Sequence, residues 1–258
     1  MSAPLETKYT EETVLWIKRH TDKLMSFGIT RPESYRFSAG QFSRLGFQQA
    51  HGFIWRAYSV VSAEYEDTLE FFAVLIEGGP FSEYFKTLAV GDQILLDKNA
   101  TGFLLPERFT DGSDLVMLST GSGIAPFMSI LKQPSIWTRF ERLVLVHSVS
   151  HKNDLVFNQQ VADLKDHPLV GEYFDRLIFQ PVVTREKVEG ALNARLPDLI
   201  KDDTLSTAIG LPFTQDATRF MICGNPDMVM DTHKALSGKG FNLNRVRVPG
   251  HILLENGF

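Results

Sequence analysis

Short apolar runs, separated by glycine, proline and polar clusters, make up most of the first hundred residues. Runs of this length that are rich in β-branched and aromatic residues predict the strands of an antiparallel barrel or sandwich. Apolar residues are almost continuous in Leu69–Ile76, which predicts a strand buried on both faces. The predicted strands are Thr13–Arg19, Leu24–Ile29, Tyr58–Ser62, Thr68–Ile76 and Gln93–Asp97.

After the turn cluster Thr110–Asp114, apolar strands alternate with helical segments. This alternation predicts a parallel, doubly wound sheet with helices on its faces. We expect the boundary within residues 105–113, which gives an antiparallel β-barrel domain over 1–108 and an α/β domain over 109–258. The predicted strands are Asp114–Ser119, Arg142–Val149, Leu177–Val183 and Arg219–Cys223, with a helix over Pro126–Lys132.

Composition and charge exclude several classes of protein. A chain of 258 residues with 43% hydrophobic content has room for a substantial core. Cys223 is the only cysteine, so the chain has no internal disulfide and cannot by itself hold an ordinary iron–sulfur cluster. No apolar run reaches the length of a membrane span, and a net charge of −5 gives no long-range attraction to nucleic acid. We expect a monomeric, cytoplasmic protein.

A glycine-rich turn, Ser119–Pro126, directly follows the first apolar strand of the second half. Gly121 and Gly123 let the backbone turn tightly and approach a diphosphate, and Pro126 suits the first turn of a helix whose N–H groups face an anion. The dinucleotide fingerprint has its third glycine where this chain has Pro126. A strand–helix turn that binds nothing is the alternative interpretation.

The residues after the second and third of these strands indicate which dinucleotide would bind. An NAD site usually has a carboxylate at the end of the second strand, whereas an NADP site needs cations for its extra phosphate. The second strand ends in His147–Lys152, which contains no acid, and Thr184 and Arg185 end the third. Arg195 begins another predicted helical turn. Two arginines can clamp a phosphate with a fork geometry that lysine lacks, although each alone also fits a solvated surface.

Two segments of the first half carry groups that suit a flavin. Arg56–Ser59 offers an arginine for a diphosphate, a tyrosine for an aromatic ring system and a hydroxyl for a ring nitrogen. Gly78–Ser82 precedes a predicted helix, Glu83–Leu88, whose N-terminus would make a second anion site. The same segments also fit an ordinary strand start and a helix capped by Ser82.

Six short segments follow one another along the chain: Arg56–Ser59, Gly78–Ser82, Thr101–Gly102, Thr120–Pro126, Thr184–Glu186 and Cys223–Met228. In this order and combination they resemble the ferredoxin–NADP reductase family, and most of all its bacterial ferredoxin/flavodoxin–NADP reductases. The resemblance covers nearly the whole chain, and the ordered set is far more specific than any one segment.

The resemblance implies an FAD-binding barrel followed by an NADP-binding domain, with the two nucleotides meeting between them. It implies an FAD-dependent enzyme that takes hydride from NADPH and passes electrons to ferredoxin or flavodoxin. Arg56 would face the FAD diphosphate, Tyr58 would pack on the isoalloxazine and Ser59 would lie near flavin N5. The other residues implied to contact FAD are Ala57, Phe72, Val74, Gly79, Pro80, Phe81, Ser82, Thr120 and Phe258.

On the dinucleotide side, Arg185 and Arg195 match the family's positions for the 2′-phosphate. Cys223 would approach the nicotinamide and, with Ser59 and Glu255, would position and tune the reacting rings without an obligate general base. A buried structural cysteine is the alternative for Cys223. The other residues implied to contact NADP are Gly121, Gly123, Ser150, Thr184, Gly224 and Asp231.

Two positions depart from the family's pattern. Bacterial relatives commonly carry an arginine where this chain has Ser150, which predicts a weaker preference for NADPH unless His151 or Lys152 compensates. The family often ends in aromatic residues that cover FAD, and here only Phe258 can take that part. A frayed terminus is the alternative for Phe258.

Other functions remain open beside this one. An NAD(P)H:flavin reductase or an oxygenase reductase component would share the same build, although the lack of cysteines excludes a fused cluster domain. A nucleotide-binding redox sensor would hold both nucleotides without turnover, and a flavin-free dehydrogenase would be colourless. Likeness of fold alone does not settle which acceptor is used.

Overall fold

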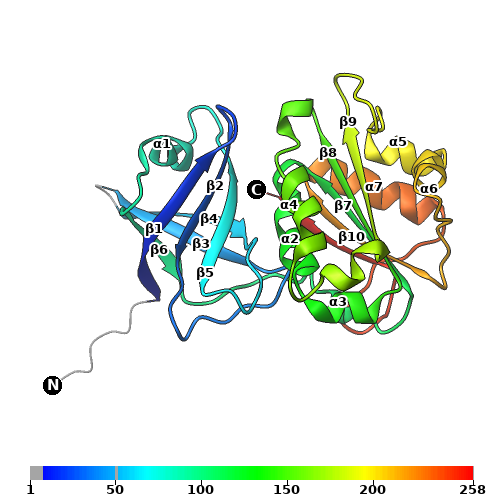
Figure 1. The fold of residues 1–258 in the computed structure, drawn as a ribbon, viewed down its shortest axis with the longest axis horizontal. Coiled ribbons are helices and arrows are strands. Elements are labelled where there is room, and N and C mark those ends of the chain that lie inside the picture. The colour runs from blue at the N-terminus through cyan, green and yellow to red at the C-terminus, as the bar shows by residue number, and fades with distance from the viewer. Residues whose placement is uncertain (1–7, 50–51, 258) are drawn as a thin grey trace.

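The computed structural model describes residues 8–49 and 52–257, and its two halves contain sheets of different kinds (Figure 1). The first half forms a six-stranded antiparallel sheet with the order β4-β3-β6-β1-β2-β5. Its elements are β1 (Tyr9–Arg19), β2 (Leu24–Thr30), β3 (Phe42–Gln49), β4 (Gly52–Ser59), β5 (Thr68–Val74), α1 (Pro80–Thr87) and β6 (Gln93–Asp97).

This first sheet curls into an incompletely closed barrel. Its end strands approach each other where Val60, just after β4, forms an antiparallel bridge with Phe71 of β5. The interior is apolar, and α1 packs against it through Phe85, whose ring lies 5.0 Å from that of Phe27. Phe71 belongs to this interior whereas Phe72 belongs to a cluster with the second domain. The prediction that this strand is buried on both faces therefore holds for its middle but is wrong for Val74 and Ile76, which are 36% and 61% exposed.

The second half forms a five-stranded parallel sheet with the order β11-β10-β7-β8-β9. Helices α2 to α4 lie on the barrel side of this sheet and α5 to α7 on the other, which confirms the predicted doubly wound architecture (Figure 1). Its elements are β7 (Asp114–Thr120), α2 (Ala125–Leu131), α3 (Pro134–Arg139), β8 (Arg142–Val149), α4 (Asn158–Asp163), β9 (Leu177–Val183), α5 (Leu196–Lys201), α6 (Thr204–Ala208), β10 (Thr218–Gly224), α7 (Pro226–Gly238) and β11 (Ile252–Asn256).

The predicted strand over Tyr58–Ser62 was wrong. The strand is β4, which ends at Ser59, and its partner β3 was not predicted at all. β3 contains Gly46, which weakens an isolated strand. Trp55 of β4 covers this glycine, because a Cβ added to Gly46 would lie 2.7 Å from the Trp55 ring. By contrast, β6, β8 and β9 have the predicted bounds.

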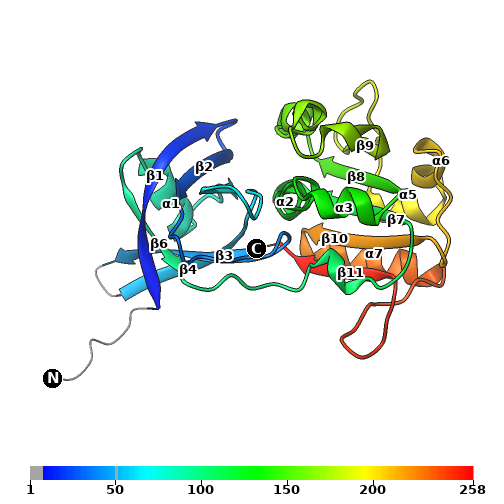
Figure 2. The ribbon, with the colours of Figure 1, turned by 60° about the horizontal axis from the view of Figure 1, so that its bottom comes forward.

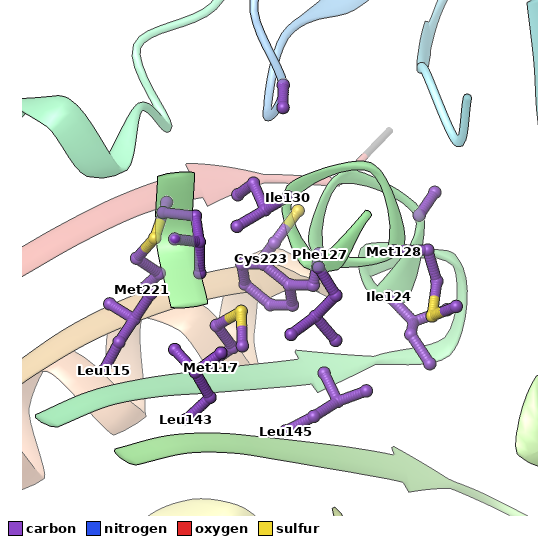
Figure 3. Packing of buried hydrophobic residues seen from close by; sticks show 14 of the residues in the cluster. Leu115, Met117, Ile124, Phe127, Met128, Ile130, Leu143, Leu145, Met221 and Cys223 are labelled. Atoms are coloured by element: carbon purple, nitrogen blue, oxygen red, sulfur yellow. The ribbon is translucent and has the colours of Figure 1, made fainter. Parts of the chain in front are cut away.

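One apolar cluster joins the two domains. Figure 3 shows its core, where α2 packs its side chains, including Phe127, onto strands of the parallel sheet. The barrel contributes Phe72, whose ring meets that of Phe157 edge-on at 4.8 Å. Ser129 of α2 also donates a buried hydrogen bond of 2.6 Å to the carbonyl of Ser62. This contact holds the barrel and the α/β domain in one arrangement.

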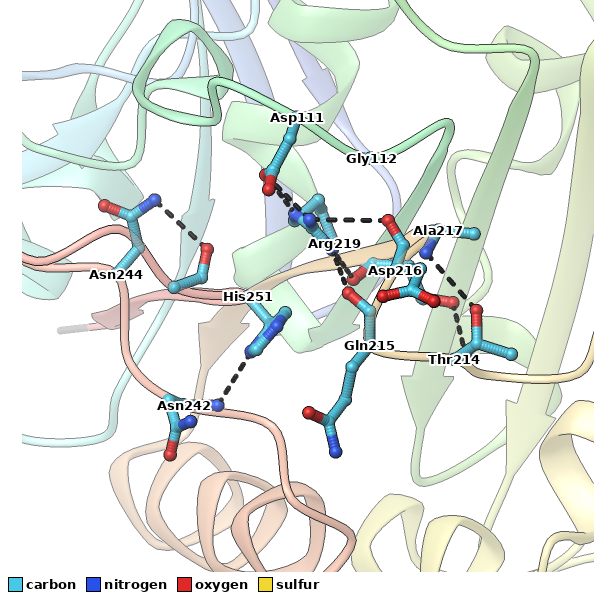
Figure 4. Close-up of polar contacts among 12 residues, drawn as sticks. Asp111, Gly112, Thr214, Gln215, Asp216, Ala217, Arg219, Asn242, Asn244 and His251 are labelled. Atoms are coloured by element: carbon cyan, nitrogen blue, oxygen red, sulfur yellow. Dashed lines mark hydrogen bonds and ion pairs between the residues drawn. The ribbon is translucent and has the colours of Figure 1, made fainter.

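The segment between the domains is anchored at the far end of β10. Figure 2 shows this segment running from β6 along the barrel to β7. Asp111 of this segment pairs with Arg219 at 2.7 Å, and the Arg219 side chain is only 3% exposed. Figure 4 shows this pair. Arg219 also donates to the carbonyls of Gln215 and Thr218, so its buried charge is fully engaged. Gly112, which has a φ of +82°, packs directly against Arg219, because an added Cβ would lie 2.7 Å from Arg219 Cγ.

Candidate active site

Two cavities lie between the domains and share part of one wall. The first has a volume of about 550 Å³ and the second of about 700 Å³. Phe72 and Val74 of β5 line both of them. The two cavities therefore adjoin at this strand, between the barrel and the parallel sheet.

The first cavity gathers the residues that the sequence associates with FAD. Its barrel side is lined by Arg56, Ala57, Tyr58, Ser59, Phe72, Val74, Ile76, Gly79, Pro80, Phe81 and Ser82, and its other side by Ser122, Gly123, Ala125, Cys223, Glu255, Asn256 and Gly257. Thr120, expected among the FAD residues, lines the second cavity instead. Gly123, expected on the dinucleotide side, lines the first. Phe258 lies outside the described residues.

Tyr58 presents an aromatic face to the first cavity at the end of β4. Its ring lies 5.6 Å from the rings of both Phe81 and Phe85, so the helix α1 supports it from behind. Burial raises the pKa of the Tyr58 phenol above its ordinary value, despite the nearby Arg56. The side chain is therefore a neutral, firmly packed ring, which suits stacking on a planar cofactor.

The start of α1 forms another part of the first cavity. The helix begins at Pro80 with Gly79 as its N-cap, so the idea that Ser82 caps it was wrong. Ser82 instead accepts a hydrogen bond of 2.7 Å from the backbone N–H of Ile76, which closes the preceding turn. The first N–H groups of a helix have no partner within the helix and favour an anion nearby.

Cys223 and Glu255 lie side by side at the ends of β10 and β11, paired in the parallel register. Burial raises the pKa of Glu255 to about 7, although the backbone N–H of Phe103 donates to its carboxylate. Burial, and then the neighbouring Glu255, raise the pKa of the Cys223 thiol. Cys223 is only 2% exposed, and its raised pKa favours the protonated thiol over the nucleophilic thiolate.

The second cavity gathers most of the residues that the sequence associates with NADP. Gly121, Ser150, Thr184, Arg185 and Arg195 line it. Two expected residues, Gly224 and Asp231, do not line either cavity. Its remaining lining residues are Lys23, Leu24, Phe72, Val74, Thr120, Ser148, Val149, Asp154, Leu196, Pro197, Asn225 and Met228.

The two arginines reach the second cavity from separate loops. Arg185 follows β9, and its backbone N–H donates to the carbonyl of Ser150 at 3.1 Å, which ties this loop to the one after β8. Arg195 is the N-cap residue of α5, and its guanidinium lies 3.6 Å from the carboxylate of Asp231 on α7. Asp231 therefore contacts an arginine of the cavity without lining the cavity itself.

The cations that line the second cavity differ from those expected to compensate for Ser150. His151 lies 3.6 Å from the carboxylate of Glu186, and neither His151 nor Lys152 lines the second cavity. Lys23, from the turn between β1 and β2, does line it. Figure 1 shows this turn on the side of the barrel that faces the α/β domain. No sequence signal singles out Lys23, because only the packing of the domains brings it there.

Two family descriptions match the chain in the same order as its domains. Residues 17–100 match the oxidoreductase FAD-binding domain, and residues 117–234 match the oxidoreductase NAD-binding domain. A ferredoxin–NADP reductase from Azotobacter vinelandii is 37% identical over 96% of both chains. A flavodoxin/ferredoxin–NADP reductase from Escherichia coli strain K12 is 35% identical over 84% of this chain and 85% of the relative.

A solved structure extends this similarity to three dimensions. The crystal structure of a ferredoxin NADP+ reductase from Neisseria gonorrhoeae with bound FAD and NADP superimposes with a TM-score of 0.92. It is 57% identical and covers 98% of this chain and 100% of that one. Fold, cavities and matched domains together define a two-domain flavoprotein oxidoreductase with an FAD-binding and an NADP-binding domain. The chain belongs to the ferredoxin–NADP reductase family.

Two further features concern membranes and metals. Among the helices of the described residues, none is both long and apolar enough to cross a membrane. Within residues 8–49 and 52–257, no group of three or more His, Cys, Asp or Glu side chains is arranged to hold a metal ion.

The pKa of Glu255 predicts a pH dependence of stability. Ionisation is harder in the folded protein, where the pKa is about 7, than in the unfolded chain, where it is near 4.5. The contribution of Glu255 to the stability of the folded state should therefore fall as pH rises from about 4.5 to about 7, and fall no further above that. Denaturant unfolding of the wild type and Glu255→Gln across this range tests it. The stability difference between them should change with pH, and a constant difference would contradict the prediction.

Proposed function

We propose that this chain is an FAD-dependent reductase that takes hydride from NADPH and delivers electrons singly to ferredoxin or flavodoxin. The observation that carries the proposal is the wall of Phe72 and Val74 shared by the two cavities. A flavin ring in the first cavity and a nicotinamide from the second would meet at this shared wall. The names of the relatives from Azotobacter and Escherichia coli support the choice of acceptor.

The lining of the first cavity fits FAD by its chemistry. Arg56 would bind the diphosphate, the Tyr58 ring would stack on the isoalloxazine and the Ser59 hydroxyl would lie near N5. The first N–H groups of α1, after Gly79, would face phosphate. When bound, FAD supplies the ability to accept a hydride and to release electrons one at a time. Asn256 and Gly257 line the same cavity, which supports a role for the tail, including Phe258, beside the flavin.

The lining of the second cavity fits NADPH. Arg185 and Arg195 would bind the 2′-phosphate, while Asp231 would hold the Arg195 guanidinium in place. Thr120 and Gly121 would lie against the diphosphate. Ser150 and Thr184 would line the pocket for the adenosine part. Gly224, at the end of β10, would let the glycine-rich turn after β7 lie close to this strand.

Cys223 and Glu255 would act at the place where the rings meet. Because the Cys223 thiol stays protonated, it would pack against the nicotinamide without reacting with it. Glu255 has a pKa of about 7, so near neutral pH its buried carboxyl can hold a proton or release one. Both residues would thus position and tune the reacting groups rather than form a bond to substrate.

The organisation of the whole chain follows from the same assignment. We place the boundary between Arg108 and Phe109, with FAD bound by residues 1–108 and NADP by 109–258. The short helical turn at Pro106–Arg108, between β6 and β7, supports this boundary. We also propose that the protein is a monomer in the cytoplasm. Its single cysteine can form no internal disulfide, which is typical of proteins in this reducing compartment.

Anaerobic stopped-flow absorbance tests the proposal. Purified protein should be yellow, NADPH should bleach it, and oxidised ferredoxin or flavodoxin should restore the colour. Yellow protein that NADPH does not bleach would be a nucleotide-binding sensor. Bleached protein that is reoxidised by free flavin and by neither carrier would be a flavin reductase. Either result contradicts the proposal.

The phosphate assignment predicts selective losses. Arg185→Ala and Arg195→Ala should each lower kcat/KM for NADPH by roughly 10- to 100-fold, since a charged hydrogen bond contributes about 1.5–3 kcal/mol. The value for NADH, which lacks the phosphate, should change little. Arg247→Ala, an exposed arginine that lines neither cavity, is the matched control. Equal losses with both donors in steady-state kinetics would refute the assignment.

A further inference from the structure

His147 is buried at the carboxyl end of β8, beside the glycine-rich turn. Its side chain is 1% exposed, and its Nε2 lies 3.1 Å from the carbonyl oxygen of Gly121. A carbonyl can only accept, so the ring must be the tautomer with hydrogen on Nε2. Nδ1 then carries a lone pair, and it has no hydrogen-bond partner among the described residues.

Packing alone does not explain a histidine at this buried position. Burying a polar nitrogen without a partner costs free energy that an aliphatic side chain would not. Burial also lowers the pKa of His147 to about 4, so the ring is neutral near pH 7 and carries no charge for an ion pair. What distinguishes His147 from a core leucine is its single donated hydrogen bond, and that bond goes to Gly121.

Gly121 is the point at which the chain passes from one cavity to the other. Thr120 and Gly121 line the second cavity, whereas Ser122 and Gly123 line the first. Gly121 has a φ of +52°, in the left-handed region that favours glycine. A trans peptide points its C=O and N–H in opposite directions. With its carbonyl held by His147, the Gly121–Ser122 peptide therefore aims the Ser122 N–H away from that buried ring.

We propose that His147 is a positioning residue whose Nε2–H holds the Gly121 carbonyl and thereby orients the turn on which the diphosphate of the nicotinamide dinucleotide rests. The inference rests on the proposed function, because it requires a dinucleotide in the second cavity. It assigns His147 no contact with substrate. Its effect is on the affinity for the dinucleotide, and it is the same for NADPH and NADH because both contain the diphosphate.

Two amide variants separate positioning from packing. His147→Gln places an N–H donor the same number of bonds from Cβ as Nε2, whereas the donor of His147→Asn is one bond shorter. Titration of the FAD-loaded protein with NADP+, followed by the flavin difference spectrum, should give near wild-type affinity for His147→Gln. For His147→Asn, affinity should fall roughly tenfold, as expected for a buried carbonyl left without its donor. KM for NADPH and NADH should rise together in this variant.

Trp137→Phe is the control for loss of a buried donor to a backbone carbonyl in the same domain, since Trp137 Nε1 donates to the carbonyl of Leu131 at 2.8 Å and lines neither cavity. It should lower stability without changing the affinity for NADP+. Equal weakening by His147→Gln and His147→Asn would overturn the proposal in favour of packing. Unchanged affinity in His147→Asn, or a loss confined to FAD retention, would also overturn it.

Nitrogen-15 NMR of histidine-labelled wild-type protein tests the inference without any variant. Near pH 7, His147 should show a protonated Nε2 and an unprotonated Nδ1. A proton on Nδ1 would contradict the hydrogen bond to Gly121. Failure of the proposed function is a separate result, because it would show as wild-type flavin that NADPH does not reduce.

Discussion

The close approach of the glycine-rich turn to the end of β10 is the constraint on which the cleft depends. A Cβ on Gly123 would lie 2.2 Å from the carbonyl oxygen of Cys223, and a Cβ on Gly224 would lie 2.3 Å from Thr120 Oγ1. Only glycine at both positions lets the turn after β7 lie so close to the end of β10. These strands flank the point where the strand order of the parallel sheet reverses, which is where such sheets bind their ligands.

The same turn leads directly into the helix that holds the domains together. α2 starts at Ala125. Its Phe127 packs onto the parallel sheet, and its Ser129 donates to the carbonyl of Ser62 in the barrel. The barrel wall at Phe72 is therefore fixed relative to the turn by packing and not only by the connecting chain. A preformed arrangement of this kind suits hydride transfer, because its rate depends on holding the nicotinamide and flavin rings in contact and in the correct orientation.

The sequence predicted those features that depend on local pattern. Strands such as β8 are continuous apolar runs, and their bounds follow from burial alone. Arg56 and Arg185 were found because they stand in short segments whose order along the chain is specific. β3 was missed because its sequence, FSRLGFQQ, combines Gly46 with polar residues and contains no continuous apolar run. Lys23 was missed because its approach to the second cavity depends on how the domains pack.

The rate of flavin reduction in a single turnover of Gly123→Ala tests this account most directly. The added methyl group must push the turn away from Cys223, so reduction by NADPH should slow by roughly a hundredfold while FAD stays bound. Gly238→Ala is the control, because its Cβ would meet nothing within 4 Å. Reduction of Gly123→Ala at the wild-type rate would contradict the claim that this contact sets the meeting of the two nucleotides.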